Sequence, residues 1–531
     1  MSDAGRPESS RGASLAHALA WTAAVKWGGQ AVSWIATLLV ARMISPHDYG
    51  VVALAAVCLG LVTIFNEFGL GYVVVVHRHL TRHQLAQVNA LALAVGLAAF
   101  GLSCAAAWPL GHLLGVPELP GIVFAMSTVL LVSAVRTVPV GILQRDLRFE
   151  RLAVAEGVQA VVAAVATVVS ALAGLGYWAL VVGQILGALA FATLALAWAP
   201  AGIARPRADT LGGILPFSRH LLVGRFAWYV SSQADQAVVG MTLGGAALGI
   251  YSMAGSLAAL PLEKIGALLG QVTPGFFAAS QASRAGLRRL VLTLSEGVAL
   301  VVFPAAAGMA LVAPELITLA LGDRWRDAIV PLQLLVAVAA FRSIQSVLSP
   351  VIFVTGGTRF SMYLSILDVT AMPVALYVGS WWGMVGVATV YGLAYLLLRV
   401  PLYVWVFRRT GLSLATYSMA LWPATSAVCV MGVVVWTVEA FIPPGWPLAL
   451  RFVVLVLVGV VGYLVPLLSV HRSSVAAFYR RFLEQRGGRE VAADPADGAR
   501  GTERLDDAVR SAAPAHNTQE LRMGATAAEG R

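Results

Sequence analysis

Four polar side chains recur at helical spacing within an apolar stretch near the middle of the chain. These residues are Arg225, Tyr229, Ser232 and Gln236, at positions i, i+4, i+7 and i+11. At about 100° per residue, they fall within roughly 60° of one another on an α-helix. A guanidinium group aligned with a phenol, a hydroxyl and an amide can hydrogen-bond to anions and hydroxyls. The stripe therefore predicts a ligand-binding face rather than a site for covalent chemistry.

The same pattern occurs 199 positions earlier in the chain. The corresponding residues are Lys26, Gln30, Ser33 and Thr37. The register continues into the next segment, where Gly249 corresponds to Gly50 and Met253 to Leu54. A cationic polar stripe that is repeated half a chain apart indicates a site built between two related halves.

The elements that carry these stripes must be membrane helices. Hydrophobic residues make up 59% of the 531 residues and charged residues only 12%, which is far from the composition of a soluble domain. Apolar runs of roughly 20 residues, each long enough to cross a bilayer as a helix, recur along the chain. They do not alternate as the strands of a membrane β-barrel would. We expect about fourteen spans, near residues 17–41, 49–73, 84–108, 120–143, 152–173, 178–199, 218–243, 250–275, 290–313, 327–354, 360–380, 384–407, 416–438 and 448–470.

The placement of arginine predicts the orientation of these spans. Only Arg42, Arg324, Arg326 and Arg451 fall in the odd-numbered turns. The even-numbered turns hold Arg78, Arg82, Arg145, Arg148, Arg151, Arg205, Arg207, Arg219, Arg284, Arg288, Arg289, Arg359, Arg408 and Arg409. Positive residues favour the cytoplasmic side, so the even turns and both termini are predicted to be cytoplasmic. The net charge of +10 thus requires no nucleic acid to explain it.

The chain divides by composition into segments of different character. We expect a cytoplasmic N-terminal segment (1–14), a six-helix lobe (15–199), a cytoplasmic linker rich in Pro, Gly and Arg (200–217), a second six-helix lobe (218–407), helices 13 and 14 (408–470), and a cytoplasmic tail without periodicity (471–531). The fold class is thus an all-α polytopic membrane protein of two pseudo-symmetric lobes plus two helices.

Lysine is rare in this chain and occurs only inside the expected spans. Lys26 and Lys264 are the only lysines among 36 basic residues. A charge near the bilayer centre costs about 3 kcal/mol on insertion scales, so it is seldom retained without a partner or a water-filled cavity. The structural alternative is an ion pair, Arg225 with Asp235 or Lys26 with Glu67. For Arg136, Arg342 and Arg399, a structural or interfacial role is the favoured interpretation.

Several motifs for chemistry are absent from the sequence. No GxxxxGK[ST], GxSxG, HExxH or DxD segment is present. The three cysteines lie inside apolar runs, and the histidines of the turn HRHLTRHQL lie among arginines, so we expect neither disulfides nor a metal site. We therefore expect no enzyme and no cofactor.

Five short motifs resemble those of a known family. They are SPHDYG at the start of helix 2, its counterpart LGGAALGIYSMA, and the segments LEKIGALLGQVTPGFF, QRDLRF and AGLGYWALVVGQILGAL. Over about residues 15–470 the chain resembles the polysaccharide transporter family of Wzx-like oligosaccharide flippases. This family belongs to the MOP superfamily, with the MATE exporters and lipid II flippases. The resemblance implies two lobes around a central cavity lined by helices 1, 2, 7 and 8, which opens alternately to either side.

The resemblance implies export of an oligosaccharide linked to undecaprenyl pyrophosphate across the bacterial inner membrane. The repeat unit would belong to an exopolysaccharide, O-antigen or capsule, and membrane lipids, a polymerase and assembly proteins are the expected partners. The predicted cavity residues are Lys26, Gln30, Asn66, Arg225, Tyr229, Gln233, Gln236 and Lys264. Glu67, Asp235 and Glu263 are candidates for coupling to H⁺ or Na⁺.

Three alternatives remain open from the sequence. A lipid II-type flippase would share the architecture, and a MATE-like exporter of small cations would use Glu67, Asp235 or Glu263 to bind its substrate. Cations at positions 26 and 225 argue against a cationic substrate. A membrane scaffold for polysaccharide synthesis that transports nothing is the third alternative.

Overall fold

The computed structural model is all helical over the residues that it describes. These are 8–66, 70–77, 79–205, 226, 228–260, 283–443, 445–474, 476, 478 and 480, with the side chains of 8–24, 26, 64–66 and 72 also left aside. Within this part of the chain, ten helical stretches are long and apolar enough to cross a membrane, and Gly245–Leu260 is a shorter apolar helix. The chain is thus a multi-span helical membrane protein, as its composition predicts.

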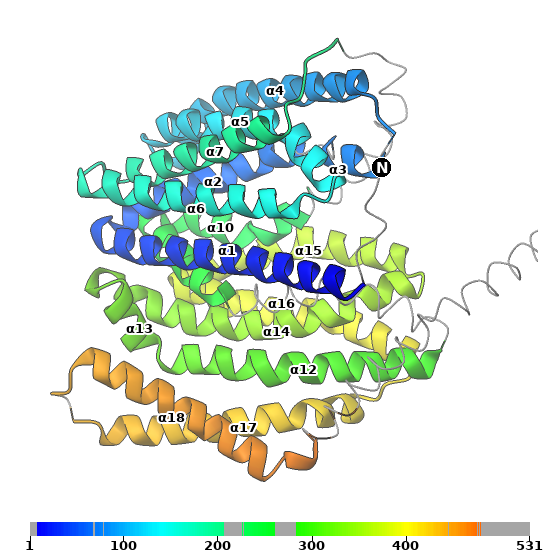
Figure 1. Cartoon of the computed structure of the whole chain (residues 1–531). Helices are drawn as coiled ribbons and strands as arrows, with labels where there is room; N and C mark the ends of the chain where they lie inside the picture. Colours follow the sequence, from blue (N-terminus) through cyan, green and yellow to red (C-terminus); the bar gives the residue numbers. More distant parts are fainter. Residues whose placement is uncertain are drawn as a thin grey trace, which may run out of the picture. The chain divides into compact units, whose positions relative to one another are not determined.

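The helices of the first half pack mainly on one another (Figure 1). Here α1 contacts α6, α6 contacts α7, and α5 contacts α2, α3, α4 and α7. Their bounds are α1 (Glu8–Met43), α2 (Pro46–Asn66), α3 (Leu70–Val76), α4 (Arg82–Leu114), α5 (Leu119–Arg145), α6 (Phe149–Leu172) and α7 (Trp178–Trp198).

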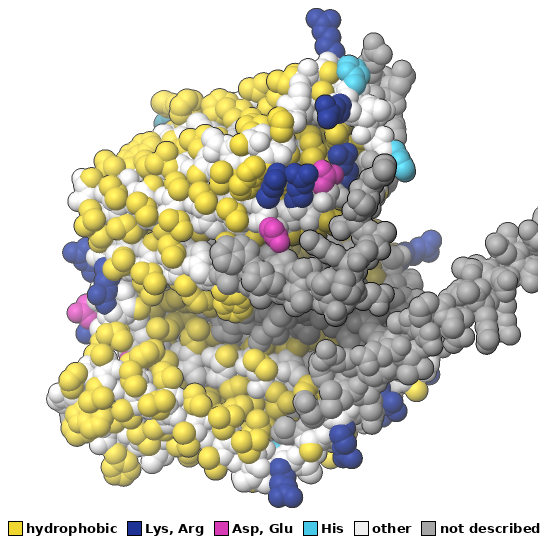
Figure 2. Space-filling view, viewed as in Figure 1, with side chains coloured by type: hydrophobic (Ala, Val, Ile, Leu, Met, Phe, Trp, Pro, Cys, Tyr) yellow, Lys and Arg dark blue, Asp and Glu magenta, His cyan; other side chains and the backbone are white. Residues whose placement is uncertain are grey.

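In the second half, α12 packs on α14 and α17, while α16 packs on α14 and α15. The bounds are α10 (Ala234–Leu243), α12 (Arg284–Leu311), α13 (Ala313–Ala320), η1 (Asp323–Ala328), α14 (Ile329–Val354), α15 (Thr358–Gly379), η2 (Ser380–Trp382), α16 (Gly383–Thr410), α17 (Leu414–Phe441) and α18 (Leu448–Ser469). The unit that begins at Leu467 is described only to residue 480. Hydrophobic side chains cover the visible face of the helices, and most Lys and Arg side chains lie toward the helix ends (Figure 2).

Helix starts follow the local sequence. The Ser45 hydroxyl accepts a hydrogen bond from the backbone N–H of Asp48 at 3.1 Å, so Ser45 is the N-cap of α2. Thr81 and Gln84 form a reciprocal capping box at the start of α4. These contacts satisfy backbone N–H groups that a helix leaves without partners at its first turn.

One expected span is interrupted, and another is described only in part. The span predicted at 218–243 is interrupted at Gln233, which has φ −110° and ψ 5° between the helical residues 228–232 and α10. The single stripe predicted from Arg225 to Gln236 assumed an unbroken helix, whereas the structure places Ser232 and Gln236 in the walls of two different pockets. The span predicted at 49–73 is described as α2 and α3, with residues 67–69 outside the description.

The repeat found in the sequence brings its two copies into direct contact. A Cβ added to Gly50 would lie 2.7 Å from the Gly249 nitrogen, and one added to Gly249 would lie 2.9 Å from the Gly50 nitrogen. The start of α2 and the start of the helix at 245–260 therefore cross backbone to backbone, at the pair of glycines that the 199-residue offset relates. Only glycine fits both positions.

A second contact joins the halves at the same end of α2. The buried Trp325 indole of η1 donates to the Ala41 carbonyl at 2.8 Å, and its ring meets Tyr49 edge-on at 5.8 Å. Arg42 donates through Nε to the Ala320 carbonyl at 2.9 Å, and through Nη2 to that of Leu319. The cation thereby contacts the C-terminal end of α13, where backbone carbonyls lack helical partners. Neither α13 nor η1 was predicted, because the sequence analysis treated this segment as a turn.

Candidate functional site

An uncharged polar cavity lies between the two copies of the repeat. Its volume is about 380 Å³, and α1, α2, α6, α7, α10 and the helix at 245–260 line it. Its hydrogen-bonding side chains are Ser33, Thr37, Tyr49, Thr167, Gln184, Gln233, Gln236, Ser252 and Ser256. The remaining lining residues are Ala, Val and Leu. The cavity offers hydroxyl and amide groups and, among the described residues, no charged one.

Equivalent positions of the two copies meet in this cavity. Thr37 and Gln236 both line it, as do Ala53 with Ser252 and Val57 with Ser256, and each pair is 199 residues apart. Gln236 of the predicted stripe and Gln233, a predicted cavity residue, are therefore brought together with Ser33 and Thr37 of the earlier copy. The second copy contributes serine where the first contributes alanine or valine, so its wall is the more polar.

Tyr229 serves as a contact between helices in this structure. Its hydroxyl donates to the Val57 carbonyl of α2 at 3.0 Å. Its ring lies over Gly60, where an added Cβ would come within 2.8 Å of the ring carbon Cε2. The phenol predicted to bind substrate is thus occupied in holding the 228–232 segment to α2.

Asp235 is held by neutral donors in the first turn of α10. Its Oδ2 accepts a hydrogen bond from the Tyr251 hydroxyl at 3.1 Å, and its Oδ1 accepts one from the Gln236 backbone N–H at 2.8 Å. The carboxylate is absent from the lining of the polar cavity.

The other predicted residues lie at the edge of the description or beyond it. Gln30 is half-buried on α1, and Lys26 lies on the same helix with its side chain outside the description. Asn66 is the last residue of α2, and its side chain is likewise left aside. Arg225, Lys264, Glu67 and Glu263 fall outside the described residues.

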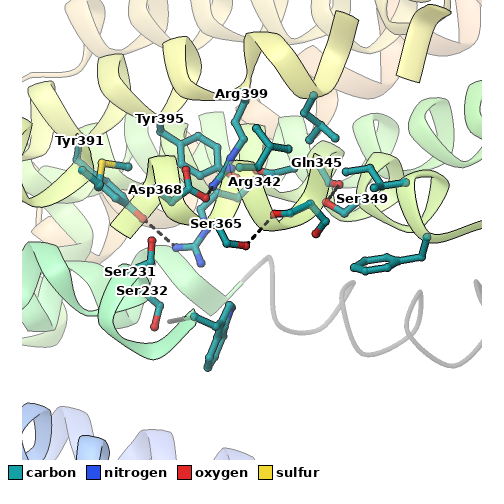
Figure 3. A pocket seen from close by; sticks show the side chains of 17 residues that line it. Ser231, Ser232, Arg342, Gln345, Ser349, Ser365, Asp368, Tyr391, Tyr395 and Arg399 are labelled. Carbon is teal, nitrogen blue, oxygen red and sulfur yellow. Dashed lines mark hydrogen bonds and ion pairs between the residues drawn. The ribbon is translucent and has the colours of Figure 1, made fainter. Parts of the chain in front are cut away.

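A second pocket, within the second half, collects charges that the sequence analysis treated as isolated (Figure 3). It has a volume of about 320 Å³ and is lined from α14, α15, α16 and residues 228–232. Arg399 Nη2 lies 2.8 Å from Oδ2 of Asp368, with both side chains 13% exposed. Arg342 Nη1 donates to the Tyr391 hydroxyl at 3.3 Å. Ser232, part of the predicted stripe, lines this pocket rather than the polar cavity.

Sequence reasoning singled out Arg342 and Arg399 inside apolar spans but did not bring them together with each other or with Asp368. Their separation in the chain carries no periodicity that would place them on one surface. The cluster could have been predicted from the rule that ionisable residues inside a membrane face one another or a cavity. The favoured interpretation of Arg342 as merely structural or interfacial did not anticipate a place in a pocket wall.

The fold is similar to that of MurJ and of MATE transporters. It superposes on the lipid II flippase MurJ in an inward closed conformation, with a TM-score of 0.69 and 13% identity over 86% of this chain and 99% of that chain. It also superposes on an inward-facing multidrug resistance MATE family transporter, with a TM-score of 0.59 and 15% identity over 71% and 94% of the two chains.

The chain belongs to the polysaccharide biosynthesis protein family, whose profile matches residues 39–330. It is 24% identical over 409 residues to the lipopolysaccharide biosynthesis protein WzxC of Escherichia coli (strain K12), over 72% of this chain and 79% of WzxC. It is 27% identical over 266 residues to the succinoglycan biosynthesis transport protein ExoT of Rhizobium meliloti (strain 1021), over 48% of this chain and 52% of ExoT. The family expected from the sequence motifs is thereby confirmed.

Proposed function

We propose that this protein is a flippase that moves a lipid-linked oligosaccharide across the bacterial inner membrane by alternating access. The observation that carries the proposal is the uncharged polar cavity between the two copies of the repeat, inside a membrane-spanning fold. Sugar hydroxyls need many hydrogen-bond partners, and serine, threonine and glutamine supply both donors and acceptors. The names of WzxC and ExoT support a task in polysaccharide biosynthesis.

The substrate would be a repeat unit on undecaprenyl pyrophosphate, as the family resemblance implies. Its pyrophosphate cannot cross hydrocarbon unaided, because burying an unpaired charge there is very costly. Lys26, Arg225 and Lys264 remain the predicted partners of this group. The described cavity wall, being uncharged, would meet the sugars.

The architecture that we propose is two six-helix lobes, 15–199 and 218–407, joined by a linker at 200–217 and followed by helices 13 and 14. Fourteen spans would place both termini in the cytoplasm. The contact between Gly50 and Gly249 supports a pseudo-two-fold relation between the lobes. In the proposed orientation this contact closes the external side, so outward opening would require the two helices to separate.

The described lining favours a polar over a cationic substrate. No carboxylate lines the polar cavity among the described residues, and Asp235 is held by Tyr251 and Gln236. A MATE-like exporter of cations would need an acid there. Coupling to H⁺ or Na⁺ through Glu67, Asp235 or Glu263 remains a prediction.

A liposome assay tests the proposal. The full-length protein is reconstituted with a fluorescent polyprenyl-pyrophosphate oligosaccharide, and a glycosidase added outside reports how fast the inner-leaflet sugar becomes accessible. Flipping should require the protein. A rate equal to that of protein-free liposomes would reject the proposed function.

The polar cavity is tested in the same assay by a pair of variants. The double change Thr37→Val and Gln236→Leu should slow flipping about tenfold or more, since each lost hydrogen bond is worth about 1 kcal/mol. Thr193→Val is the matched control, because Thr193 is exposed on α7 and bonds only its own helix. An unchanged rate in the double variant would remove the polar cavity from the pathway.

A further inference from the structure

The pocket between α14, α15 and α16 has a cation with spare hydrogen-bond donors. A guanidinium carries five N–H donors, and in the described part of the chain Arg342 uses one, toward Tyr391. No described carboxylate lies within ion-pair distance of Arg342. Asp235 acts on it only at longer range and is itself held by Tyr251 and Gln236. Figure 3 shows the guanidinium between Tyr391 and Ser231, at the pocket wall.

The charge of the second arginine in the pocket is already balanced by a carboxylate. Arg399 is paired with Asp368, and its guanidinium lies 5.0 Å from the centre of the Tyr395 ring. An ion pair removed from water in this way holds its geometry, because either partner alone would be a costly buried charge. Arg399 and Asp368 therefore shape the wall, and Arg342 is the group that remains for an anion.

The pocket also offers acceptors without donors. Gln345 Oε1 and Asp368 Oδ1 are buried and have no hydrogen-bond partner among the described residues. The hydroxyls of Ser232, Ser349 and Ser365 donate to backbone carbonyls of their own helices, which leaves their oxygens free to accept. Such acceptors require hydroxyl or amide donors from whatever enters the pocket.

Size and aromatic lining fit a small ring. A volume of about 320 Å³ is at the lower end of the roughly 300–1,000 Å³ of ligand pockets. Trp228, Tyr391 and Tyr395 add aromatic surface next to the polar groups. A ligand that matches this pocket is a compact molecule with one anionic group beside several hydroxyls.

We propose that this pocket binds an acidic monosaccharide of the transported glycan, with its carboxylate on Arg342 and its hydroxyls on Gln345, Asp368 and the serine oxygens. This assignment rests on the proposed function, because it supposes that the substrate is a glycan. It names the substrate class as acidic. Arg342 is then the residue that separates a uronic acid from the neutral sugar of the same shape.

Equilibrium binding to the purified full-length protein in micelles tests the assignment. The probes are methyl glucuronoside, methyl glucoside and inorganic pyrophosphate, measured by ligand-detected NMR, which reads weak affinities. The wild type should bind the glucuronoside about tenfold more tightly than the glucoside, as a charged hydrogen bond permits. Arg342→Gln should remove the preference, and Arg342→Lys should retain part of it.

Two further variants separate binding from folding. Arg408→Gln, on the exposed end of α16 outside the pocket, should bind as the wild type does. Ser231→Phe fills the pocket without removing a charge and should abolish binding of both sugars. The unfolding temperature and the elution profile of each variant verify that it is folded. If Arg342→Gln does not fold, Ser231→Phe still tests whether the sugars bind in this pocket.

Three results would overturn the assignment: no preference in the wild type, a preference that survives Arg342→Gln or Ser231→Phe, or tighter binding of pyrophosphate that depends on Arg342. The last would assign the pocket to the carrier linkage. The liposome assay separates this question from the proposed function. If the protein flips a neutral glycan but does not bind the glucuronoside, the proposed function stands and the assignment of the pocket is rejected. If it binds the glucuronoside but flips no glycan, the assignment of the pocket stands and the proposed function is rejected.

Discussion

Arg451 joins three helices through a single side chain. Its Nε lies 2.6 Å from Oε1 of Glu315 on α13, and its Nη2 donates to Oε1 of Glu439 on α17 at 2.6 Å. The Glu315 side chain is only 3% exposed, whereas that of Arg451 is 31% exposed. Burying a carboxylate to this degree is costly unless a cationic partner such as the guanidinium pairs with it. This pair therefore fixes α13, whose other end contacts Arg42.

Arg451→Ala should destabilise the protein by about 3 kcal/mol, toward the low end for a buried pair because Arg451 is partly exposed. The measurement is the shift in thermal unfolding in micelles. Adding Glu315→Gln should recover part of the loss, since the buried charge disappears with its partner. Arg326→Ala is the control, because its pair with Asp323 is exposed and worth at most about 1 kcal/mol. Equal shifts for Arg451→Ala and Arg326→Ala would contradict the role of Glu315.

Lys26 and Arg225 remain the predicted pair for the pyrophosphate, because they occupy equivalent positions of the repeat. Either Lys26→Ala or Arg225→Ala should abolish export while protein levels stay near normal, and Arg225→Lys should keep part of the activity. A structural ion pair would behave differently, with loss of folded protein that is rescued by neutralising the partner acid. Normal export from a well-expressed double variant would end this hypothesis.

Helix positions were predictable at the level of elements, while interruptions were not. Apolar runs of about 20 residues predict where α4 to α7, α12 and α14 to α18 lie, although the predicted ends of α4 and α12 fall several residues short of the observed ones. The interruption at Gln233 was missed, because an amide in a polar stripe is compatible with a continuous helix. The pocket of Arg342, Asp368 and Arg399 was missed for a related reason, since contacts between helices leave no period in one sequence.

The crossing of α2 with the helix at 245–260 can be tested with one methyl group. Gly50→Ala should force the helices apart, because the added Cβ would meet the backbone of Gly249 and Gly245. Spin labels at Leu175→Cys and Trp381→Cys, both exposed, report the separation by pulsed electron resonance in a background without the native cysteines. We expect the distance between the two labels to be longer in the Gly50→Ala protein than in the protein that retains Gly50.

Gly101→Ala is the control for the crossing, since a Cβ at Gly101 meets nothing within 4 Å. It should leave the distance distribution as in the wild type. A Gly50→Ala protein with the wild-type distribution would show that the crossing yields without separating the helices.

At the scale of the whole molecule, three sets of contacts join helix ends that are distant in the sequence. The turns after α1 and after α10 meet at Gly50 and Gly249, and that after α13 joins them through Trp325. The turn before α4 meets the segment after α7 through Ala86 and Ala204, and Arg284 meets the carbonyl of Arg408. Each set joins only odd-numbered or only even-numbered turns of the arginine analysis, and the side on which either kind of turn lies stays a prediction.

Reporter fusions test whether the even-numbered turns face the cytoplasm and the odd-numbered turns face the outside. A reporter fused after Arg207 should read cytoplasmic and one at Gly245 external, following the arginine asymmetry. The contact of Gly249 with Pro46 adds that a fusion after His47 must agree with the one at Gly245. The same location for the Arg207 and Gly245 fusions would reject the proposed layout.

The hydrogen bond between Ala41 and Trp325 has a consequence for biosynthesis. Its two residues are 284 positions apart, so at about 5–20 residues per second the ribosome needs roughly 15–60 s to supply the partner. During that interval the last turn of α1 is in the membrane with the Ala41 carbonyl still lacking its indole. If the ribosome stalls before residue 325, the first half of the chain is left without Trp325. The surface around the Ala41 carbonyl then stays uncovered, and this exposed surface distinguishes the truncated product from the finished protein.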